Sequence, residues 1–270
     1  MKKTLAILSA LCAAAGALAQ VPAKITLKNN PEQTLAGEIR WQASGNQYAF
    51  SYRIPSSPNP VSKTYSPADI IKMEIQPPAN FRAVSDQIRG ANPESAIPAL
   101  NKWVTDYKML EWDGIAAAEI AKIHKKSKKW DEIVKLGDKV VAENPGAAVT
   151  SVFAPLYWEA LLQSGKSSSR LEKWVDDAIA TASGSIAAAA LNIRGDMLRA
   201  DKKLKEALVD GYLRVALMYT KEGETNAEAL YKAAEVFSEL GQSSYAEKMR
   251  AQLNNAHRSS PWTRKLLGGS

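Results

Sequence analysis

The chain has 270 residues, with 35 lysines and arginines against 28 aspartates and glutamates, so its formal charge at pH 7 is +7. Its single cysteine excludes a disulfide framework, clustered thiolate metal ligands and dithiol redox chemistry within the chain. The modest positive charge favours an acidic protein face, an anionic lipid surface or an acidic polymer over a neutral partner.

The N-terminal segment has the pattern of a secretory signal peptide. Lys2 and Lys3 give a positive start, residues 5–18 form an apolar run, and the small residues of Ala17–Ala19 fit a cleavage site. The run is shorter than the roughly 20 apolar residues that a bilayer requires, so no transmembrane segment is expected. We therefore expect a periplasmic or secreted protein that does not meet nucleic acid. A lipid anchor on Cys12 is the alternative, although the large leucine before it disfavours lipidation.

The segment after the signal is predicted to be a small β module. Period-two alternation of apolar and polar residues, or short apolar runs, predict strands near residues 35–41, 48–54, 63–65 and 70–75. Ser44–Asn46 is a plausible hairpin turn, and Ser66 with Pro67 predicts a single capped helical turn. This order of elements resembles small barrels of the Src-homology-3 or Sm type, a fold that does not by itself define a function.

Alternating aromatic residues in this module have two interpretations. They either fill the core of the module and its contact with the next segment, which we favour, or line a groove for a proline-rich peptide. The residues concerned are Trp41, Tyr48, Phe50, Tyr52 and Tyr65.

The rest of the chain is predicted to be helical, with glycine and proline between the helices. The expected helices span residues 81–89, 95–110, 113–126, 129–143, 148–164, 168–182, 185–200, 202–220, 226–240 and 243–257. Small or aliphatic residues begin the second helix of four successive pairs, at spacings of 38, 36 and 39 residues: Ile133, Leu171, Ala207 and Ala246. Two helices per unit at such a spacing indicate a helical solenoid.

The glycine and alanine spacing resembles that of tetratricopeptide repeats. Leu240–Gly241 before Ala246, and Gly195 twelve residues before Ala207, match positions of that family. The chain departs from the family where Gly137 and Gly211 replace a large aromatic residue. Ile133 and Leu171 also replace alanine, and the units exceed 34 residues.

The predicted fold is α+β by domain, with a small N-terminal β barrel followed by an all-α right-handed helical-repeat array of the tetratricopeptide type. The expected division is a signal peptide at 1–19, the β module at 20–78, the array at 79–260 and a C-terminal tail at 261–270.

The resemblance implies ligand-facing positions on the first helix of each pair. These partner-binding candidates are Lys122, Lys125, Gln163, Asn192, Asp196, Arg199, Tyr231 and Glu235. Three- and four-residue steps put Asn192, Asp196 and Arg199 on one helix face, which we expect to be exposed, with charges that contribute little to stability. Such a mixed polar surface suits an extended peptide or a chain terminus.

No pattern of catalytic or metal-binding residues is recognisable. His124 and His257 are the only histidines, they belong to different helices, and the lysines around His124 repel a cation. The lysines at 122, 125, 126, 128 and 129 fit a helix C-terminus, with a docking patch for an anionic partner as the alternative. Tryptophans 103, 112, 130, 158 and 174 fit packing between helices, with sugar stacking as the alternative. We expect neither a cofactor nor a metal.

The sequence therefore predicts a non-enzymatic, exported adaptor or scaffold of the cell envelope that binds a protein or peptide. A binding module for an envelope polymer, peptidoglycan or polysaccharide, is the alternative, and an unrecognised enzyme is a remote one.

Overall fold

A computed structural model describes residues 20–54, 59–166, 168–182 and 184–268. The predicted signal peptide lies outside these residues. The described chain divides into two compact units. The first runs to Phe81 and adds Lys102–Asp113, and the second comprises Arg82–Asn101 and everything from Gly114 onward. This arrangement confirms a β region followed by a helical array, which is α+β by domain.

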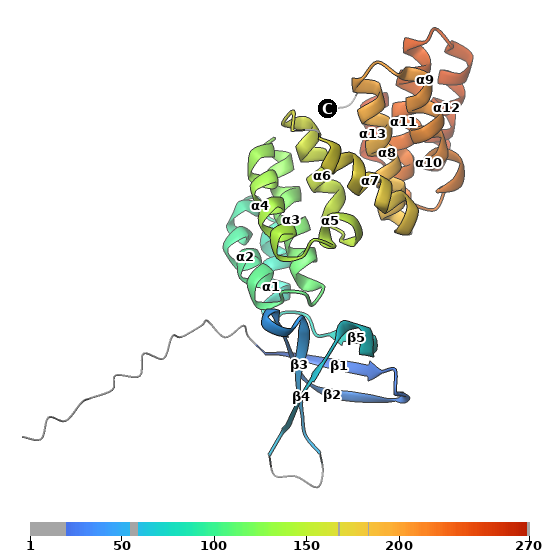
Figure 1. The fold of residues 1–270 in the computed structure, drawn as a ribbon. Coiled ribbons are helices and arrows are strands. Elements are labelled where there is room, and N and C mark those ends of the chain that lie inside the picture. The colour runs from blue at the N-terminus through green and yellow to red at the C-terminus, as the bar shows by residue number, and fades with distance from the viewer. Residues whose placement is uncertain (1–19, 55–58, 167, 183, 269–270) are drawn as a thin grey trace, which may run out of the picture. The chain divides into compact units, whose positions relative to one another are not determined.

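The first unit contains one open antiparallel sheet of five strands in the order β4-β3-β2-β1-β5 (Figure 1). The strands are β1 (Val21–Leu27), β2 (Asn30–Gln42), β3 (Gln47–Tyr52), β4 (Val61–Tyr65) and β5 (Ile70–Ile75). The sequence indicated four of them but not β1, which lies between β2 and β5. Since β4 and β5 are the two edges of the sheet, closure into a barrel is not confirmed.

The short connections of the sheet follow the predicted turn chemistry. Between β2 and β3, the turn η1 (Ala43–Gly45) ends at Asn46 with a φ of 48°. Between β4 and β5, the turn η2 (Pro67–Asp69) is capped by Ser66, whose Oγ accepts from the backbone N–H of Ala68 at 3.1 Å. The side chain of Asp69 accepts from the backbone N–H of Ser66 at 3.0 Å, which completes a capping box and confirms the predicted capped turn.

The aromatic residues of β2 and β3 form the core of this sheet. Phe50 is completely buried, Trp41 and Tyr48 are buried, and the Trp41 and Tyr48 rings meet edge to face at 4.9 Å. The Tyr48 hydroxyl donates to the carbonyl of Met109 at 2.9 Å, within the same unit. Burial confirms the core interpretation for these three side chains, whereas Tyr52 and Tyr65 are half-buried.

The helices match the predicted ones closely, with two exceptions. The helices are α1 (Phe81–Arg89), α2 (Ile97–Asp106, after the turn η3, Pro93–Ala96), α3 (Trp112–Lys126), α4 (Trp130–Glu143), α5 (Ala147–Thr150), α6 (Ala154–Gln163), α7 (Ser169–Thr181), α8 (Gly184–Ala200), α9 (Leu204–Ala207), α10 (Leu213–Met218), α11 (Gly223–Glu239), α12 (Ser243–Ala256) and α13 (Pro261–Leu266). Helix α13 lies in the segment predicted to be a tail. The predicted helix over 148–164 is split into α5 and α6, because Ser151 is extended and Pro155 lies in the first turn of α6. Within the described ranges, none of these helices has the length and apolarity that crossing a membrane requires.

Between α9 and α10 lies a π-helical turn, η4 (Leu208–Tyr212). A π turn adds a residue to the helical ladder and so rotates the side chains that follow it. Gly211 and Tyr212 of η4 are both buried. The turn therefore directs these two residues into the array.

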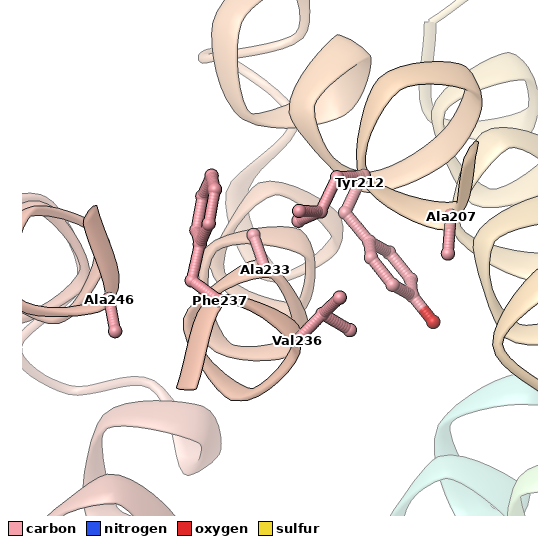
Figure 2. Packing of buried hydrophobic residues seen from close by; sticks show 7 residues of the cluster. Ala207, Tyr212, Ala233, Val236, Phe237 and Ala246 are labelled. Carbon is pink, nitrogen blue, oxygen red and sulfur yellow. The ribbon is translucent and has the colours of Figure 1, made fainter. Parts of the chain in front are cut away.

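The predicted anchors of the four second helices are all fully buried. They are Ile133, Leu171, Ala207 and Ala246. Figure 2 shows two of them in a shared core, in which Ala207 and Tyr212 lie on one side of Ala233, Val236 and Phe237, and Ala246 lies on the other. Helix α11 thus packs between two other helical segments, as stacking requires, although the repeat family itself is not confirmed.

Glycines allow the closest helix contacts in the array. A Cβ on Gly211 would lie 2.6 Å from the Cα of Gly195, so η4 touches the backbone of α8. A Cβ on Gly195 would lie 2.5 Å from the ring of Tyr212, and one on Gly137 would lie 2.2 Å from the ring of Tyr157. Gly137 and Gly211, where the repeat family has aromatic residues, therefore make room for a neighbouring ring or backbone.

The Gly211 contact can be tested by one substitution. We expect Gly211→Ala to lower the free energy of unfolding by about 3 kcal/mol, because the added methyl group meets backbone that cannot move aside. Gly114→Ala on α3 is the control, since its Cβ would lie at an ordinary 3.7 Å from the Cβ of Ser151, and alanine should be neutral or stabilising there. Urea denaturation followed by circular dichroism measures both. Equal effects of the two substitutions would contradict the close packing of η4 on α8.

Candidate partner-binding cleft

A cleft of about 430 Å³ lies in the second unit, along helices α6, α8, α11 and α13. Its walls include Glu159 and Gln163 from α6, Asp196 and Arg199 from α8, and Tyr231 and Glu235 from α11. Trp262 and Lys265 come from α13. We call it the α6–α13 cleft. Helices α6, α8 and α11 are each the first helix of a predicted pair. The cleft therefore lies along the helices that the sequence indicated as ligand-facing.

The cleft brings together five of the eight residues predicted to bind a partner. These are Gln163, Asp196, Arg199, Tyr231 and Glu235. Lys122 does not line the cleft, and its ammonium group pairs with Glu119 of its own helix at 2.6 Å. Lys125 binds Glu159 at 2.6 Å and so connects α3 to a wall of the cleft.

The prediction that Asn192 is exposed is wrong. Its side chain is only 2% exposed, and its Nδ2 donates to the backbone carbonyl of Thr225 at 2.9 Å. The three- and four-residue spacing from Asp196 and Arg199 is real, but the N-terminal turn of α11 covers this end of the face. Asn192 therefore connects α8 to α11.

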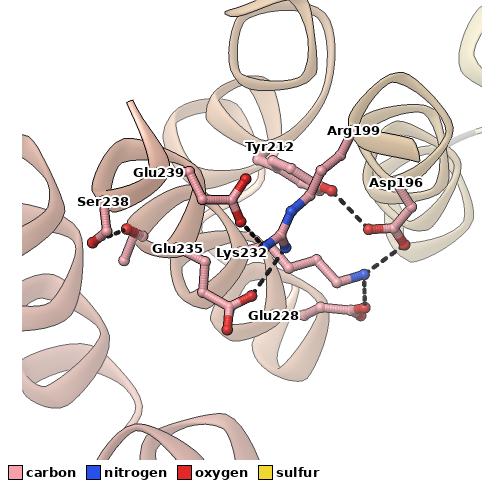
Figure 3. Close-up of polar contacts among 9 residues, drawn as sticks. Asp196, Arg199, Tyr212, Glu228, Lys232, Glu235, Ser238 and Glu239 are labelled. Atoms are coloured by element: carbon pink, nitrogen blue, oxygen red, sulfur yellow. Dashed lines mark hydrogen bonds and ion pairs between the residues drawn. The ribbon is translucent and has the colours of Figure 1, made fainter. Parts of the chain in front are cut away.

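A largely buried lysine, Lys232, links the same two helices (Figure 3). Nζ of Lys232, whose side chain is 14% exposed, lies 2.6 Å from Asp196 and 2.5 Å from Glu228. The other carboxylate oxygen of Asp196 accepts from the hydroxyl of Tyr212 at 2.7 Å. Sequence reasoning missed Lys232, although its four-residue spacing from Glu228 is a recognisable helix ion pair.

A second ionic contact joins α8 to α11 further along the cleft. Arg199 binds Glu235 at 3.0 Å and also contacts Glu239 (Figure 3). The hydroxyl of Tyr231 hydrogen-bonds Glu235 as well. The prediction that Asp196 and Arg199 are exposed is therefore wrong, because both are half-buried and form ion pairs between α8 and α11.

The surroundings of Tyr212, Lys232 and Glu235 hold each of these side chains in one protonation state. Burial raises the pKa of Tyr212, and the neighbouring Asp196 raises it further. Burial opposes the charge of Lys232, but Glu228 and Asp196 outweigh it and raise the pKa of the ammonium group. Burial also raises the pKa of Glu235, but hydrogen bonds from Tyr231 and Arg199 outweigh it, and the pKa of this carboxyl is lowered. Lys232 and Glu235 therefore stay charged and Tyr212 stays neutral near pH 7.

Helix α13 contributes an aromatic and cationic group to the cleft. The ring of Trp262 lies 5.3 Å from that of Tyr231, and Nζ of Lys265 lies 4.6 Å from the Tyr231 ring and 5.4 Å from the Trp262 ring. Ser260, which is buried, caps the helix by accepting from the backbone N–H of Trp262. The sequence did not indicate this group, because residues 261–270 were predicted to be a C-terminal tail.

Contacts in the structure bear on two alternatives outside the cleft, a docking patch for the clustered lysines and sugar stacking for the tryptophans. Lys129 pairs with Glu94 at 2.7 Å, so three of the five clustered lysines face carboxylates of this chain. Trp103 and Trp158 are buried, which agrees with packing, whereas the other three tryptophans named above are half-buried.

A larger pocket of about 560 Å³ lies between α7 and α8 and reaches η4. Its walls include Val175 and Met197, and the ion pair of Asp176 with Arg194 lies at its edge. It contains none of the predicted binding residues. As for metals, the residues that the structure describes contain no group of three or more histidine, cysteine or acidic side chains that could hold an ion.

Comparisons of this chain with protein-family models, with curated proteins and with solved structures gave no match. The resemblance to tetratricopeptide repeats therefore stays a proposal.

Removing Lys232 tests the ion network. We expect Lys232→Met to lower the free energy of unfolding by about 3 kcal/mol, because Asp196 and Glu228 are left without their shared cation. Lys205→Met on α9, where the lysine is exposed, is the control and should change stability by less than about 0.5 kcal/mol. Urea denaturation at pH 7 measures both. If Lys232→Met left the free energy of unfolding unchanged, the ion network would contribute nothing to folding.

The raised tyrosine pKa values predict a loss of stability in alkali. A group whose pKa is higher in the folded protein contributes fully below its unfolded pKa, and that contribution is lost as the pH rises. The contribution of Tyr231 to stability is lost between pH 10.0 and about 12. The pKa of Tyr212 is raised in the same direction. Between pH 9 and 11 the loss should be about 1 kcal/mol smaller in Tyr212→Phe than in the unaltered protein. Exposed Tyr245→Phe is the control, and an equal loss in both variants would contradict the assignment.

Proposed function

We propose that this protein is a non-enzymatic adaptor of the cell envelope whose helical array binds an extended segment of another protein in the α6–α13 cleft. The observation that carries the proposal is the gathering of polar and aromatic side chains from four separate helices along one cleft. Such a surface offers hydrogen bonds, charge and ring faces over several successive positions, which suits a peptide chain better than a compact apolar ligand.

The protonation states in the cleft support binding rather than catalysis. A general base near neutral pH needs a pKa close to 7. The environment moves Lys232 of the cleft, and Tyr212 behind it, away from that range, since it raises the pKa of both. The carboxylates around them are engaged in ion pairs, so a proton-transfer group for a substrate is not evident among these residues.

Export to the envelope is the proposed location, and it rests on the signal-peptide pattern of the sequence. Stacked helix pairs of the tetratricopeptide kind are the proposed architecture of the array. It is supported by the four buried anchors and by the packing of α8 against α6, α7, η4 and α11.

An envelope polymer is the second candidate ligand. The observation in its favour is the half-buried Trp262 in the cleft beside Tyr231, because sugar rings stack on such faces. The ionic walls of the cleft favour the peptide, and the experiment below separates the two.

A photo-crosslinking amino acid placed at Gln163 tests the proposal. Gln163 is exposed and lines the cleft, whereas Gln87 on α1 is exposed and does not line it. Benzoylphenylalanine at either position should leave the thermal melting curve unchanged. On illumination in envelope extracts of the native host, we expect a discrete protein adduct from position 163 and none from position 87.

Equal adducts from both positions would contradict a specific cleft. The unaltered protein is also sedimented with purified cell wall. Co-sedimentation that Gln163→Trp abolishes, in the absence of a protein adduct, would favour the polymer.

A further inference from the structure

The charges that line the α6–α13 cleft are not equally available to a partner. Each of its four acidic side chains is engaged by a cation of this chain: Glu159 by Lys125, Asp196 and Glu228 by Lys232, and Glu235 by Arg199. A basic partner would have to displace one of these cations, and breaking a partly buried pair is costly. The cleft is therefore poorly suited to a basic segment, despite its acidic residues.

Lys265 differs from the other cations of the cleft. Arg199 and Lys232 are held by carboxylates, whereas Lys265, among the described residues, makes no ion pair and lies over the rings of Tyr231 and Trp262. Its charge acts on Glu235 at longer range. An exposed ammonium group held against ring faces is desolvated on one side only, so it can still accept a carboxylate.

The helix that carries Lys265 is fixed in place. The hydroxyl of Ser260 donates to Glu224 at 2.6 Å, and the hydroxyl of Thr263 donates to the carbonyl of His257 at 2.6 Å. Both side chains are buried, and Trp262 and Leu266 pack against the core around Tyr231 and Leu253. A positioned cation binds a ligand without a further entropic cost for ordering its helix.

We propose that the α13 end of the cleft selects an acidic side chain, glutamate above all, within an extended peptide segment of the partner, with Lys265 as the residue that determines this specificity. This inference rests on the proposed function. The carboxylate would pair with Lys265, and the methylene groups of a glutamate would lie against Trp262. The adjoining ring faces favour a carboxylate on an alkyl stem over a chain terminus, whose carboxylate is attached directly to the polar backbone.

A defined peptide tests the proposal without a known partner. The probe is a fluorescein-labelled octapeptide of alternating glutamate and alanine with an amidated C-terminus, and its binding to the full chain is measured by fluorescence anisotropy. We expect saturable binding that Lys265→Glu and Lys265→Gln weaken at least tenfold and that Lys265→Arg largely retains. The same octapeptide with glutamine in place of glutamate should not bind.

Lys248→Glu is the matched control for net charge. Lys248 lies on α12 outside the cleft, with its ammonium group 5.3 Å from the Tyr245 ring. Its reversal changes the net charge of the chain as much as Lys265→Glu does. Equal losses in the two variants would overturn the proposal, because they would show non-specific attraction to a basic protein. Melting curves of all variants verify folding. If Lys265→Glu is unstable, the binding measurement with Lys265→Gln still tests the proposal.

Two further results would overturn the choice of ligand. The first is binding of the glutamine peptide only when its C-terminus is a free carboxylate, which would indicate a chain terminus. The second is Lys265-dependent binding of polygalacturonate but of no peptide, which would indicate an acidic polysaccharide. A protein adduct at position 163 that persists in Lys265→Glu, with no peptide bound by any variant, would overturn the acidic specificity but leave the adaptor function standing.

Discussion

The contact between Gly211 and Gly195 is the constraint on which the charged cleft depends. Because neither residue has a Cβ, η4 approaches α8 closely enough for the ring of Tyr212 to lie on Gly195. From there its hydroxyl reaches Asp196, and Asp196 holds Lys232 of α11. The position of α11, and with it one wall of the cleft, thus depends on backbone contact between two helices that precede it.

The sequence predicts the helices and their buried anchors well because both depend on local information. Apolar spacing along one helix reports which residues are buried, and Ile133 and Leu171 are buried although the repeat family has alanine there. Strand β1 was missed although its sequence, VPAKITL, alternates apolar and outward-facing residues with the period of two that predicts a strand. Helix α13 was missed because six residues are too short for a clear helical period. The π turn, too, has no signature in spacing.

The site was only partly predictable, since spacing identifies a helix face but not what covers it. Gln163 and Tyr231 line the cleft as expected, whereas Asn192, one turn before Asp196 on α8, is covered by α11. Whether a charged side chain is free or paired depends on residues more than 30 positions away, as with Arg199 and Glu235. No periodicity in a single sequence reports such long-range pairs.

The ion pairs between α8 and α11 give the cleft a defined geometry before any partner arrives. Hydrogen-bonded charges are directional, so they fix the relative register of two helices more strictly than apolar packing does. Asn192, Asp196 and Arg199 contact α11 at three successive turns of α8, which resists both sliding and rotation. A partner that binds such a surface loses its own conformational freedom but does not have to order the receptor. In the proposed peptide complex, selectivity depends on the few groups that the register leaves unpaired, and the short helix α13 carries one of them, Lys265.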